Sequence, residues 1–248
     1  MKIQHALIAL FAALVFVAIG CHIMDIQKDG VMVVAFTGDS NTIPHPDHDS
    51  WGEVFEAMME GRAMPWQSSI HAVYAAPAGH HPTWPDGYDL LAQALASTPP
   101  PDVVVIAVGE VNVAAVALYG CPPSKEVVPQ KSYRECLYGI RDILREQYNT
   151  AAATGAYVYV ATTPPYFLPA WNPTVYNFLA RRFKNILIRE FGRDHIIDRY
   201  TGIGPEHLSE DLVHLNPAGH YELACRLYAA INHRAHPTCQ NFVITPPA

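Results

Sequence analysis

Three polar residues near the two ends of the chain have the types and spacing that nucleophilic catalysis needs. Ser40 lies in the polar turn 37–41 (TGDSN), directly after the apolar run 31–36. Asp211 comes three residues before His214, just ahead of an expected helix. In such a D-x-x-H loop the carboxylate accepts a hydrogen bond from one ring nitrogen, which leaves the other nitrogen to take a proton. We interpret Ser40 as a nucleophile, His214 as its base and Asp211 as the residue that orients the base.

The elements that must position these residues follow from the hydrophobic pattern. Five short apolar runs, rich in β-branched residues, predict strands at 31–36, 70–74, 102–108, 157–162 and 195–198. Helical periodicity predicts helices at 50–59, 87–96, 132–148, 174–191 and 216–232. This alternation predicts an α/β fold, a three-layer α/β/α sandwich with a central, mostly parallel five-stranded sheet. Ligands of such sheets bind beyond the carboxyl ends of the strands, where Ser40 is expected.

Helix start signals support two of these elements. Ser50 and Glu53 form the S-x-x-E pattern of a capping box just before an apolar periodic run. Asn216 is a suitable N-cap for the last helix, with Pro217 at its first position. Both helices are therefore expected to begin within a few residues of the candidate chemistry.

Two motifs in the chain resemble those of the SGNH hydrolases, also called GDSL-like esterases. They are GDSN at 38–41 and DLVHLNPAGH at 211–220, and the resemblance extends over roughly residues 31–232. It implies a flavodoxin-like fold and a serine that attacks an ester, with the aspartate and histidine of D-x-x-H completing a triad. Neither the resemblance nor the residues call for a metal or a cofactor.

The resemblance also implies an oxyanion hole. The family's second motif supplies a glycine N–H, and Gly79 occupies that place here. Its third motif is G-x-N-D, whereas residues 109–112 read GEVN, so the asparagine comes one residue late and no aspartate follows. We expect the N–H groups of Ser40 and Gly79, with the side-chain amide of Asn112, to hold the oxyanion. The alternative for Asn112 is a helix cap.

The leading functional hypothesis is an exported serine esterase that hydrolyses acyl esters. A short acyl group is favoured, such as an O-acetyl group on a glycan or a small ester. An acyltransferase or a lysophospholipase on the same fold is an alternative, since an acyl-serine can pass its group to other acceptors. A non-catalytic surface protein with an SGNH-like fold is another, because the third motif is irregular.

The first 20 residues are typical of an export signal. Lys2 is the only charged residue before an apolar run over 6–20, and Cys21 follows directly. Three alternatives stay open: a lipobox at 17–21 with a lipidated Cys21, an uncleaved membrane anchor, or a cleaved signal peptide. Residues 21–29 would be a linker and 30–248 a single domain. The protein is then periplasmic, extracellular or anchored to a membrane through its N-terminus alone.

Cysteine content and charge narrow the class further. Of five cysteines, four remain besides Cys21, and an even number in an exported chain favours disulfides. We expect local pairs, Cys121 with Cys136 and Cys225 with Cys239. The net charge of −7 and the lack of a basic run argue against a nucleic-acid partner. A small-molecule or glycan ester is the expected partner.

Other polar residues compete for roles near the site. The H-P-D-H stretch 45–48 and the pair His80 and His81 are interpreted as loop histidines at the mouth of the site, because Pro46 disrupts regular ligand spacing. Asp198, at the end of the fifth expected strand, is a second candidate to orient His214.

Four aromatic residues fall in expected loops. They either line a substrate platform or cover the edge of the sheet: Trp84, Tyr166, Phe167 and Trp171.

Overall fold

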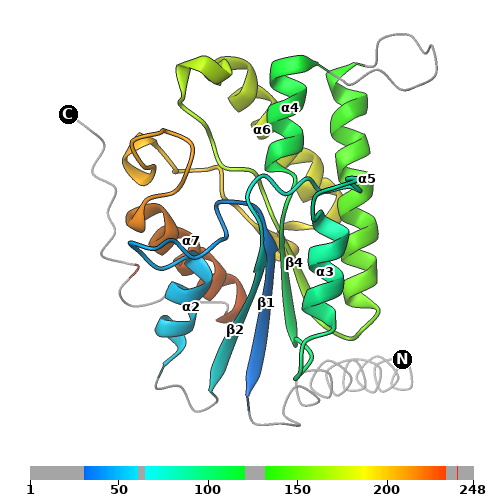
Figure 1. The fold of residues 1–248 in the computed structure, drawn as a ribbon, viewed down its shortest axis with the longest axis vertical. Helices are drawn as coiled ribbons and strands as arrows, with labels where there is room; N and C mark the ends of the chain where they lie inside the picture. The colour runs from blue at the N-terminus through cyan, green and yellow to red at the C-terminus, as the bar shows by residue number, and fades with distance from the viewer. Residues whose placement is uncertain (1–30, 61–64, 121–131, 233–238, 240–248) are drawn as a thin grey trace, which may run out of the picture.

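A parallel five-stranded sheet forms the centre of the computed structural model, which describes residues 31–60, 65–120, 132–232 and 239 (Figure 1). The strand order is β2-β1-β3-β4-β5. All four strand pairings are parallel. The strands are β1 (Met32–Gly38), β2 (Trp66–Ala72), β3 (Val103–Ala107), β4 (Tyr157–Ala161) and β5 (Ile196–Ile197). The predicted α/β class and the five-stranded sheet are confirmed.

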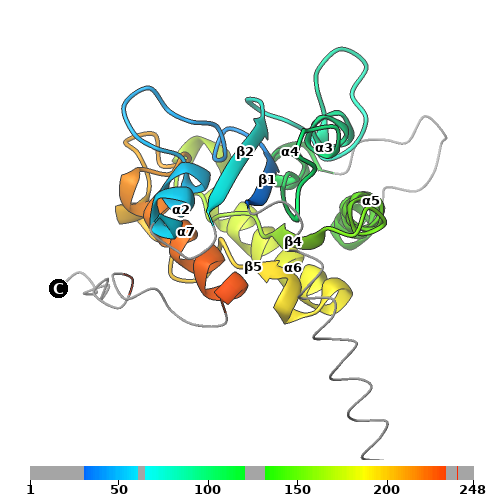
Figure 2. The ribbon, with the colours of Figure 1, turned by 90° about the horizontal axis from the view of Figure 1, so that it is seen from below.

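Helices cover both faces of the sheet and complete the predicted three layers (Figure 2). The α-helices are α2 (Trp51–Met59), α3 (Gly87–Leu95), α4 (Glu110–Tyr119), α5 (Tyr133–Ala152), α6 (Pro173–Phe191) and α7 (Pro217–Asn232). Helices α2 and α7 lie together on one face, and α3, α5 and α6 lie on the other. Each face buries its own apolar core. The candidate residues follow the carboxyl ends of the strands, so the site lies at one edge of this sandwich.

The pattern of burial explains where the strand predictions held and where they did not. Strand β1 is buried along its whole length, and its unbroken apolar run made it easy to recognise. Strand β2 begins at Trp66, four residues before the expected start, because it is an edge strand whose polar residues Gln67, Ser68 and Ser69 are not fully buried. An edge strand tolerates such residues, and they hide its start from a search for apolar runs.

Helix α4 was not predicted. Its sequence, EVNVAAVALY, is apolar around nearly its whole circumference and has no polar stripe. Gly109 begins it with a φ of 106°, a left-handed conformation that glycine adopts without a Cβ clash. The GEVN stretch at 109–112 therefore forms the cap and first turn of a helix, with Asn112 at its third position.

The capping box at the start of α2 has the predicted geometry. The Ser50 N–H donates to a carboxylate oxygen of Glu53 over 2.7 Å, and the Glu53 N–H donates to the Ser50 hydroxyl over 3.4 Å. The helix then buries Trp51 and Phe55, with Trp51 packed edge-on against Phe36 of β1. The chain between β1 and α2, which carries Ser40, is thus held at both ends.

Cys225 in α7 and Cys239 form a disulfide, with 5.9 Å between their Cα atoms. This is one of the two expected local pairs. Cys21 and Cys121 lie outside the described residues, as does the expected signal at 1–20, so those assignments stay predictions. Within the described ranges, no helix combines the length and apolar character that crossing a membrane requires.

Replacing Ser50 by alanine removes the hydroxyl that caps α2. We expect Ser50→Ala to lower the free energy of unfolding by about 1 kcal/mol, measured by urea denaturation. Ser50→Thr keeps a capping hydroxyl and is expected to lose less. Equal losses for both variants would contradict a capping role.

Candidate active site

Ser40, His214 and Asp211 converge at the carboxyl edge of the sheet. Nε2 of His214 lies 2.9 Å from the Ser40 hydroxyl oxygen, although the two residues are 174 positions apart. Nδ1 of His214 lies 2.5 Å from a carboxylate oxygen of Asp211. Both ring nitrogens of the histidine are therefore engaged, one by the serine and one by the aspartate. This is the geometry of a base held between a nucleophile and an orienting acid.

The loop that carries Asp211 and His214 is built around the aspartate side chain. One carboxylate oxygen accepts the N–H groups of Val213 (3.0 Å) and His214 (2.9 Å). Leu212 adopts a left-handed φ of 58°, a strained conformation for a side chain of this size. Burial alone would raise the pKa of Asp211, but the hydrogen bonds from His214 and Val213 outweigh it and lower that pKa. Asp211 is therefore ionised at neutral pH, as the partner of a base must be.

Asn41 connects the Ser40 turn to the loop that carries His214. The Leu215 N–H donates to the amide oxygen of Asn41 over 2.8 Å. The amide NH₂ of Asn41 donates to Glu110 in the first turn of α4, also over 2.8 Å. Asn41 and Glu110 are both about 1% exposed. Sequence reasoning missed this role, although both residues belong to the motifs that it singled out.

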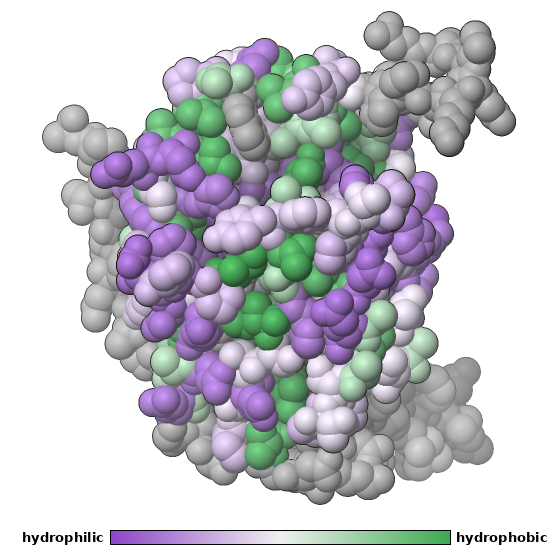
Figure 3. All heavy atoms as spheres, viewed as in Figure 1, coloured by the Kyte–Doolittle hydropathy of each residue, from purple (hydrophilic) through white to green (hydrophobic). Residues whose placement is uncertain are grey.

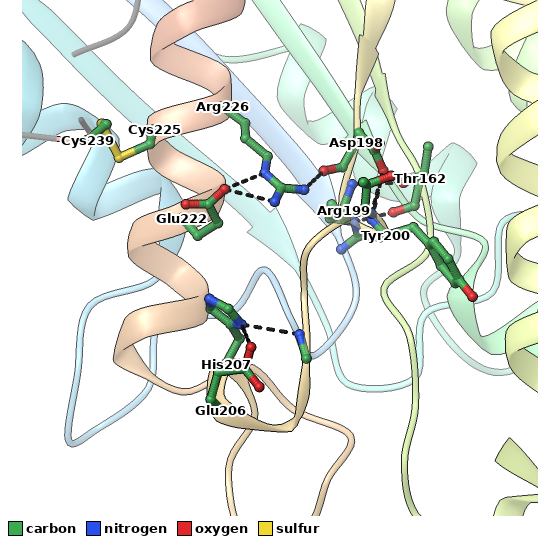
Figure 4. A network of polar contacts seen from close by, with 12 residues as sticks. Thr162, Asp198, Arg199, Tyr200, Glu206, His207, Glu222, Cys225, Arg226 and Cys239 are labelled. Carbon is green, nitrogen blue, oxygen red and sulfur yellow. Dashed lines mark hydrogen bonds and ion pairs between the residues drawn. A yellow bond between two sulfur atoms is a disulfide. The ribbon is translucent and has the colours of Figure 1, made fainter. Parts of the chain in front are cut away.

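A cluster of buried charges lies beneath Ser40. Arg199 is fully buried, and its guanidinium lies 4.0 Å from Asp39 and 3.8 Å from Glu110. The guanidinium donates to the backbone carbonyl oxygen of Thr162 over 2.5 Å. The backbone N–H of Arg199 donates to the Thr162 hydroxyl (Figure 4). The Tyr166 hydroxyl also donates to Glu110. Arg199, which lies near both acids, is thus fixed where strands β4 and β5 end.

The two acids in this cluster share one cation. Burial and the neighbouring Glu110 raise the pKa of Asp39 to about 8, despite the opposing effect of Arg199. Burial likewise raises the pKa of Glu110. One guanidinium offsets one negative charge, and a second buried charge is costly. The Asp39–Glu110 pair therefore keeps a proton at neutral pH.

Asp198 does not orient His214. It pairs with the Lys184 ammonium group at 2.5 Å and accepts the N–H groups of Tyr200 and Thr201. Burial would raise the pKa of Asp198, but these partners lower it to about 2. Figure 4 shows its backbone carbonyl oxygen accepting from Arg226 of α7. Its contacts hold the end of β5 to the surrounding helices, which explains a paired, half-buried acid outside the candidate triad.

A cavity of about 150 Å³ opens beside Ser40. Imidazoles form much of its wall. His45 and His48 stack with ring centroids 4.4 Å apart, and His220 lies 5.1 Å from His48. Burial chiefly lowers the pKa of His220 to about 3, so this ring is neutral. Nδ1 of His220 accepts the backbone N–H of Trp51 over 3.2 Å, which leaves the ring proton on Nε2.

The histidines of the H-P-D-H stretch thus lie at the mouth of the site, as expected. Across the described part of the chain, no group of three or more His, Cys, Asp or Glu residues has the arrangement of a metal site.

Two of the three expected oxyanion donors, Gly79 and Asn112, lie next to each other in the fold. The amide oxygen of Asn112 accepts the Ala78 N–H over 2.7 Å, and Gly79 follows directly. A side chain at Gly79 would come within 2.9 Å of Ile143, so the loop runs close against α5. Since Asn112 uses its oxygen here, its NH₂ group is the part left to face a substrate. Neither residue lines the cavity beside Ser40, and their role stays a prediction.

The expected aromatic platform is only partly correct. Tyr166 is 2% exposed and stacks on Tyr176 with centroids 4.1 Å apart, so it belongs to the core. Its hydroxyl is satisfied by Glu110, which is why a tyrosine is tolerated there. Phe167 packs against the core beneath α2 and α7. Trp84 is exposed, as a platform residue must be, and the side chain of Trp171 lies outside what the structure describes.

The raised pKa of Asp39 predicts that the free energy of unfolding depends on pH. Above about pH 4 the unfolded chain releases a proton that the folded state holds until about pH 8. The contribution of this group to stability is therefore complete below pH 4 and is lost as the pH rises towards 8.

Asp39→Asn removes the titrating group, and it is expected to flatten the fall in unfolding free energy between pH 4 and 8. Urea denaturation at a series of pH values measures this. A slope equal to that of the wild type would contradict the assignment.

Comparison of the sequence with models of known families gives no match, and comparison with curated protein sequences gives none either. The fold, by contrast, is shared with solved structures. An inhibitor-bound aryl esterase from M. smegmatis has a TM-score of 0.57 and 19% identity, over 82% of this chain and 99% of its own.

Two further solved structures are similar over a comparable length. The acetyl xylan esterase AlAXEase has a TM-score of 0.55 and 18% identity, over 81% and 100% of the two chains. A structure described as a lipolytic protein of the G-D-S-L family from Desulfitobacterium hafniense has a TM-score of 0.54 and 16% identity, over 80% and 99%. The chain therefore has the fold of the SGNH, or GDSL-like, hydrolases.

Proposed function

We propose that this protein is a serine esterase that hydrolyses short-chain acyl esters. The observation that carries the proposal is the continuous hydrogen-bonded line from Asp211 through His214 to Ser40. A serine hydroxyl is a weak nucleophile unless a base takes its proton, and this arrangement supplies that base in the right tautomer. Solved structures with a similar fold, an aryl esterase and an acetyl xylan esterase among them, support ester hydrolysis as the reaction class.

The mechanism follows from the roles of these three side chains. Nε2 of His214 takes the Ser40 proton while the serine oxygen bonds to the ester carbonyl carbon. The resulting oxyanion would be held by the N–H groups of Ser40 and Gly79 and the NH₂ group of Asn112. His214 then gives its proton to the leaving alcohol, and an acyl-serine remains. Water gives a proton to the same ring and attacks the acyl-serine carbonyl carbon. The ring then returns that proton to the Ser40 oxygen as the acid leaves.

The small cavity favours a short acyl group. Its volume of about 150 Å³ is below the roughly 300–1,000 Å³ of pockets that bury drug-sized ligands. Its lining includes several imidazoles and the hydroxyl of Ser209, so it is not the apolar channel that a long acyl chain needs. An acetyl group or one of similar size fits this description, and a lysophospholipase is disfavoured.

Export is part of the proposal. The apolar run at 6–20 supports a signal peptide or an N-terminal anchor, with Cys21 as the residue for lipidation. The Cys225–Cys239 disulfide is in keeping with an oxidising compartment. We therefore place the domain in the periplasm, outside the cell or on a membrane held by its N-terminus.

Labelling with a fluorophosphonate tests the nucleophile without knowledge of the substrate. We expect the label on Ser40 in the wild type, and none on Ser209, which lines the same cavity but donates to the Leu215 carbonyl oxygen. Ser40→Ala is expected to lose labelling and to slow p-nitrophenyl acetate hydrolysis by roughly 10⁴-fold or more. Unlabelled Ser40 with unchanged hydrolysis in the variant would refute the proposal.

The choice between two aspartates gives a matched test of the orienting acid. Asp211→Asn is expected to lower kcat on the order of 10⁴-fold, because an amide favours the wrong tautomer of His214. Asp198→Asn removes the Lys184 ion pair and is expected to lower the melting temperature while kcat stays within about twofold. Similar kcat losses in both variants would mean that the assignment is wrong.

A further inference from the structure

An open groove of about 510 Å³ lies between the loop after β2 and helix α3. Trp84, Asp89 and Gln93 are among the residues that line it. Asp89 and Gln93 are four residues apart, so they lie side by side on the exposed surface of α3. The indole ring of Trp84 is 49% exposed. The groove therefore joins a large aromatic surface to two side chains that can hydrogen-bond to a ligand.

This groove continues towards the Ser40 cavity across a single residue. The Trp84 indole N–H donates to the backbone carbonyl oxygen of Tyr74 over 3.0 Å. Tyr74 in turn lines the cavity beside Ser40. Tyr74 is 57% exposed, so an aromatic residue stands at the surface where the two hollows meet. Tyr74 therefore connects the two hollows, because its backbone holds Trp84 and it also lines the cavity beside Ser40.

The groove is held in shape by one buried carboxylate. Asp86 is 1% exposed and accepts the N–H groups of His81 (2.8 Å) and Tyr88 (2.9 Å). Burial would raise the pKa of Asp86, but these hydrogen bonds, with one from Asp89, lower it, so the carboxylate stays ionised and keeps its donors. Prolines at 82 and 85 further restrict the loop. A surface organised in advance loses little entropy when it binds.

The chemistry of the groove selects among ligand classes. A sugar ring presents an apolar C–H face that suits an aromatic ring and a rim of hydroxyls that suits Asp89 and Gln93. A polyanion is disfavoured by Asp89 and by the net charge of −7. A lipid surface would need a broad apolar patch, whereas Figure 3 shows small hydrophobic patches separated by hydrophilic residues on the face that carries α3.

We propose that this groove binds the backbone of an uncharged glycan, with sugar rings stacked on Trp84, and presents O-acyl groups on that glycan to Ser40. The inference rests on the proposed esterase function and names the alcohol part of its substrate. Trp84 is then a binding residue for the polymer and takes no part in the bond-breaking step. Hydrolysis of a small ester, which cannot reach the groove, is independent of it.

The test compares Trp84→Ala with Tyr119→Ala, which removes an aromatic ring that is 83% exposed at the end of α4. The substrates are acetylated xylan, acetylated glucomannan and p-nitrophenyl acetate. Trp84→Ala is expected to lower kcat/KM at least tenfold on an acetylated glycan through KM, with p-nitrophenyl acetate hydrolysis within twofold of the wild type. Tyr119→Ala is expected to change neither. Equal losses on both kinds of substrate would overturn the inference.

A binding measurement separates this inference from the proposed function. Electrophoresis through gels that contain deacetylated xylan or glucomannan reports glycan binding without catalysis. Retardation of the wild type and of Ser40→Ala, lost in Trp84→Ala, would support the groove even if the protein were inactive. An active esterase that neither of these glycans retards would overturn the glycan site and leave the esterase intact.

Discussion

The distance between Ser40 and His214 depends on the side chain of Asn41. This amide accepts the N–H of Leu215 at one end and donates to Glu110 at the other, so it joins the turn after β1, the loop before α7 and the start of α4. Asn41 follows Ser40 directly in the sequence, and Leu215, which it holds, follows His214. A hydrogen bond buried in this way is costly to break without replacement, since each partner would be left unsatisfied. The line from Asp211 to Ser40 is therefore maintained by an interaction one layer beneath it.

The buried charges beneath Ser40 belong to the same arrangement. Glu110 receives Asn41 and Tyr166, and Arg199 lies between Glu110 and Asp39. Buried ion pairs of this kind add little net stability compared with apolar packing. Their value here is geometric, because each charged group demands partners in defined directions and so fixes where the three segments meet. The retained proton reduces the electrostatic cost of placing two carboxylates together.

The two hollows at this edge differ in a way that suits the two parts of an ester. The cavity beside Ser40 is small and walled by imidazoles, and it limits what can stand on the acyl side. The groove beyond Tyr74 is larger and open, with an exposed indole and polar neighbours. A small acyl group on a bulky, hydroxyl-rich alcohol matches this division. The loop over residues 74–86 connects the two, and the ionised Asp86 keeps it in place.

Local pattern determined much of the fold. Runs such as VVVIA in β3 and the capping box of α2 predict their own elements, because burial on both faces and N-cap chemistry are properties of neighbouring residues. Residue types and spacing in the motifs at 38–41 and 211–220, with their resemblance to a family, also indicated Ser40, Asp211 and His214 as the candidate site. Helix α4 escaped prediction because an all-round apolar segment carries no periodic signal.

Tertiary structure alone decided which distant groups meet. The sequence correctly placed Tyr166 in a loop but gave no sign of its burial, and it left Glu110 and Arg199 without a role. Packing brings Asn41, Tyr166 and Arg199 together around Glu110. For the orienting acid, the three-residue spacing to His214 already favoured Asp211, and the structure adds that the competing Asp198 pairs with Lys184 instead. The physical reason is that ion pairing and burial depend on spatial neighbours, and neighbours 50 to 170 positions apart leave no trace in local spacing.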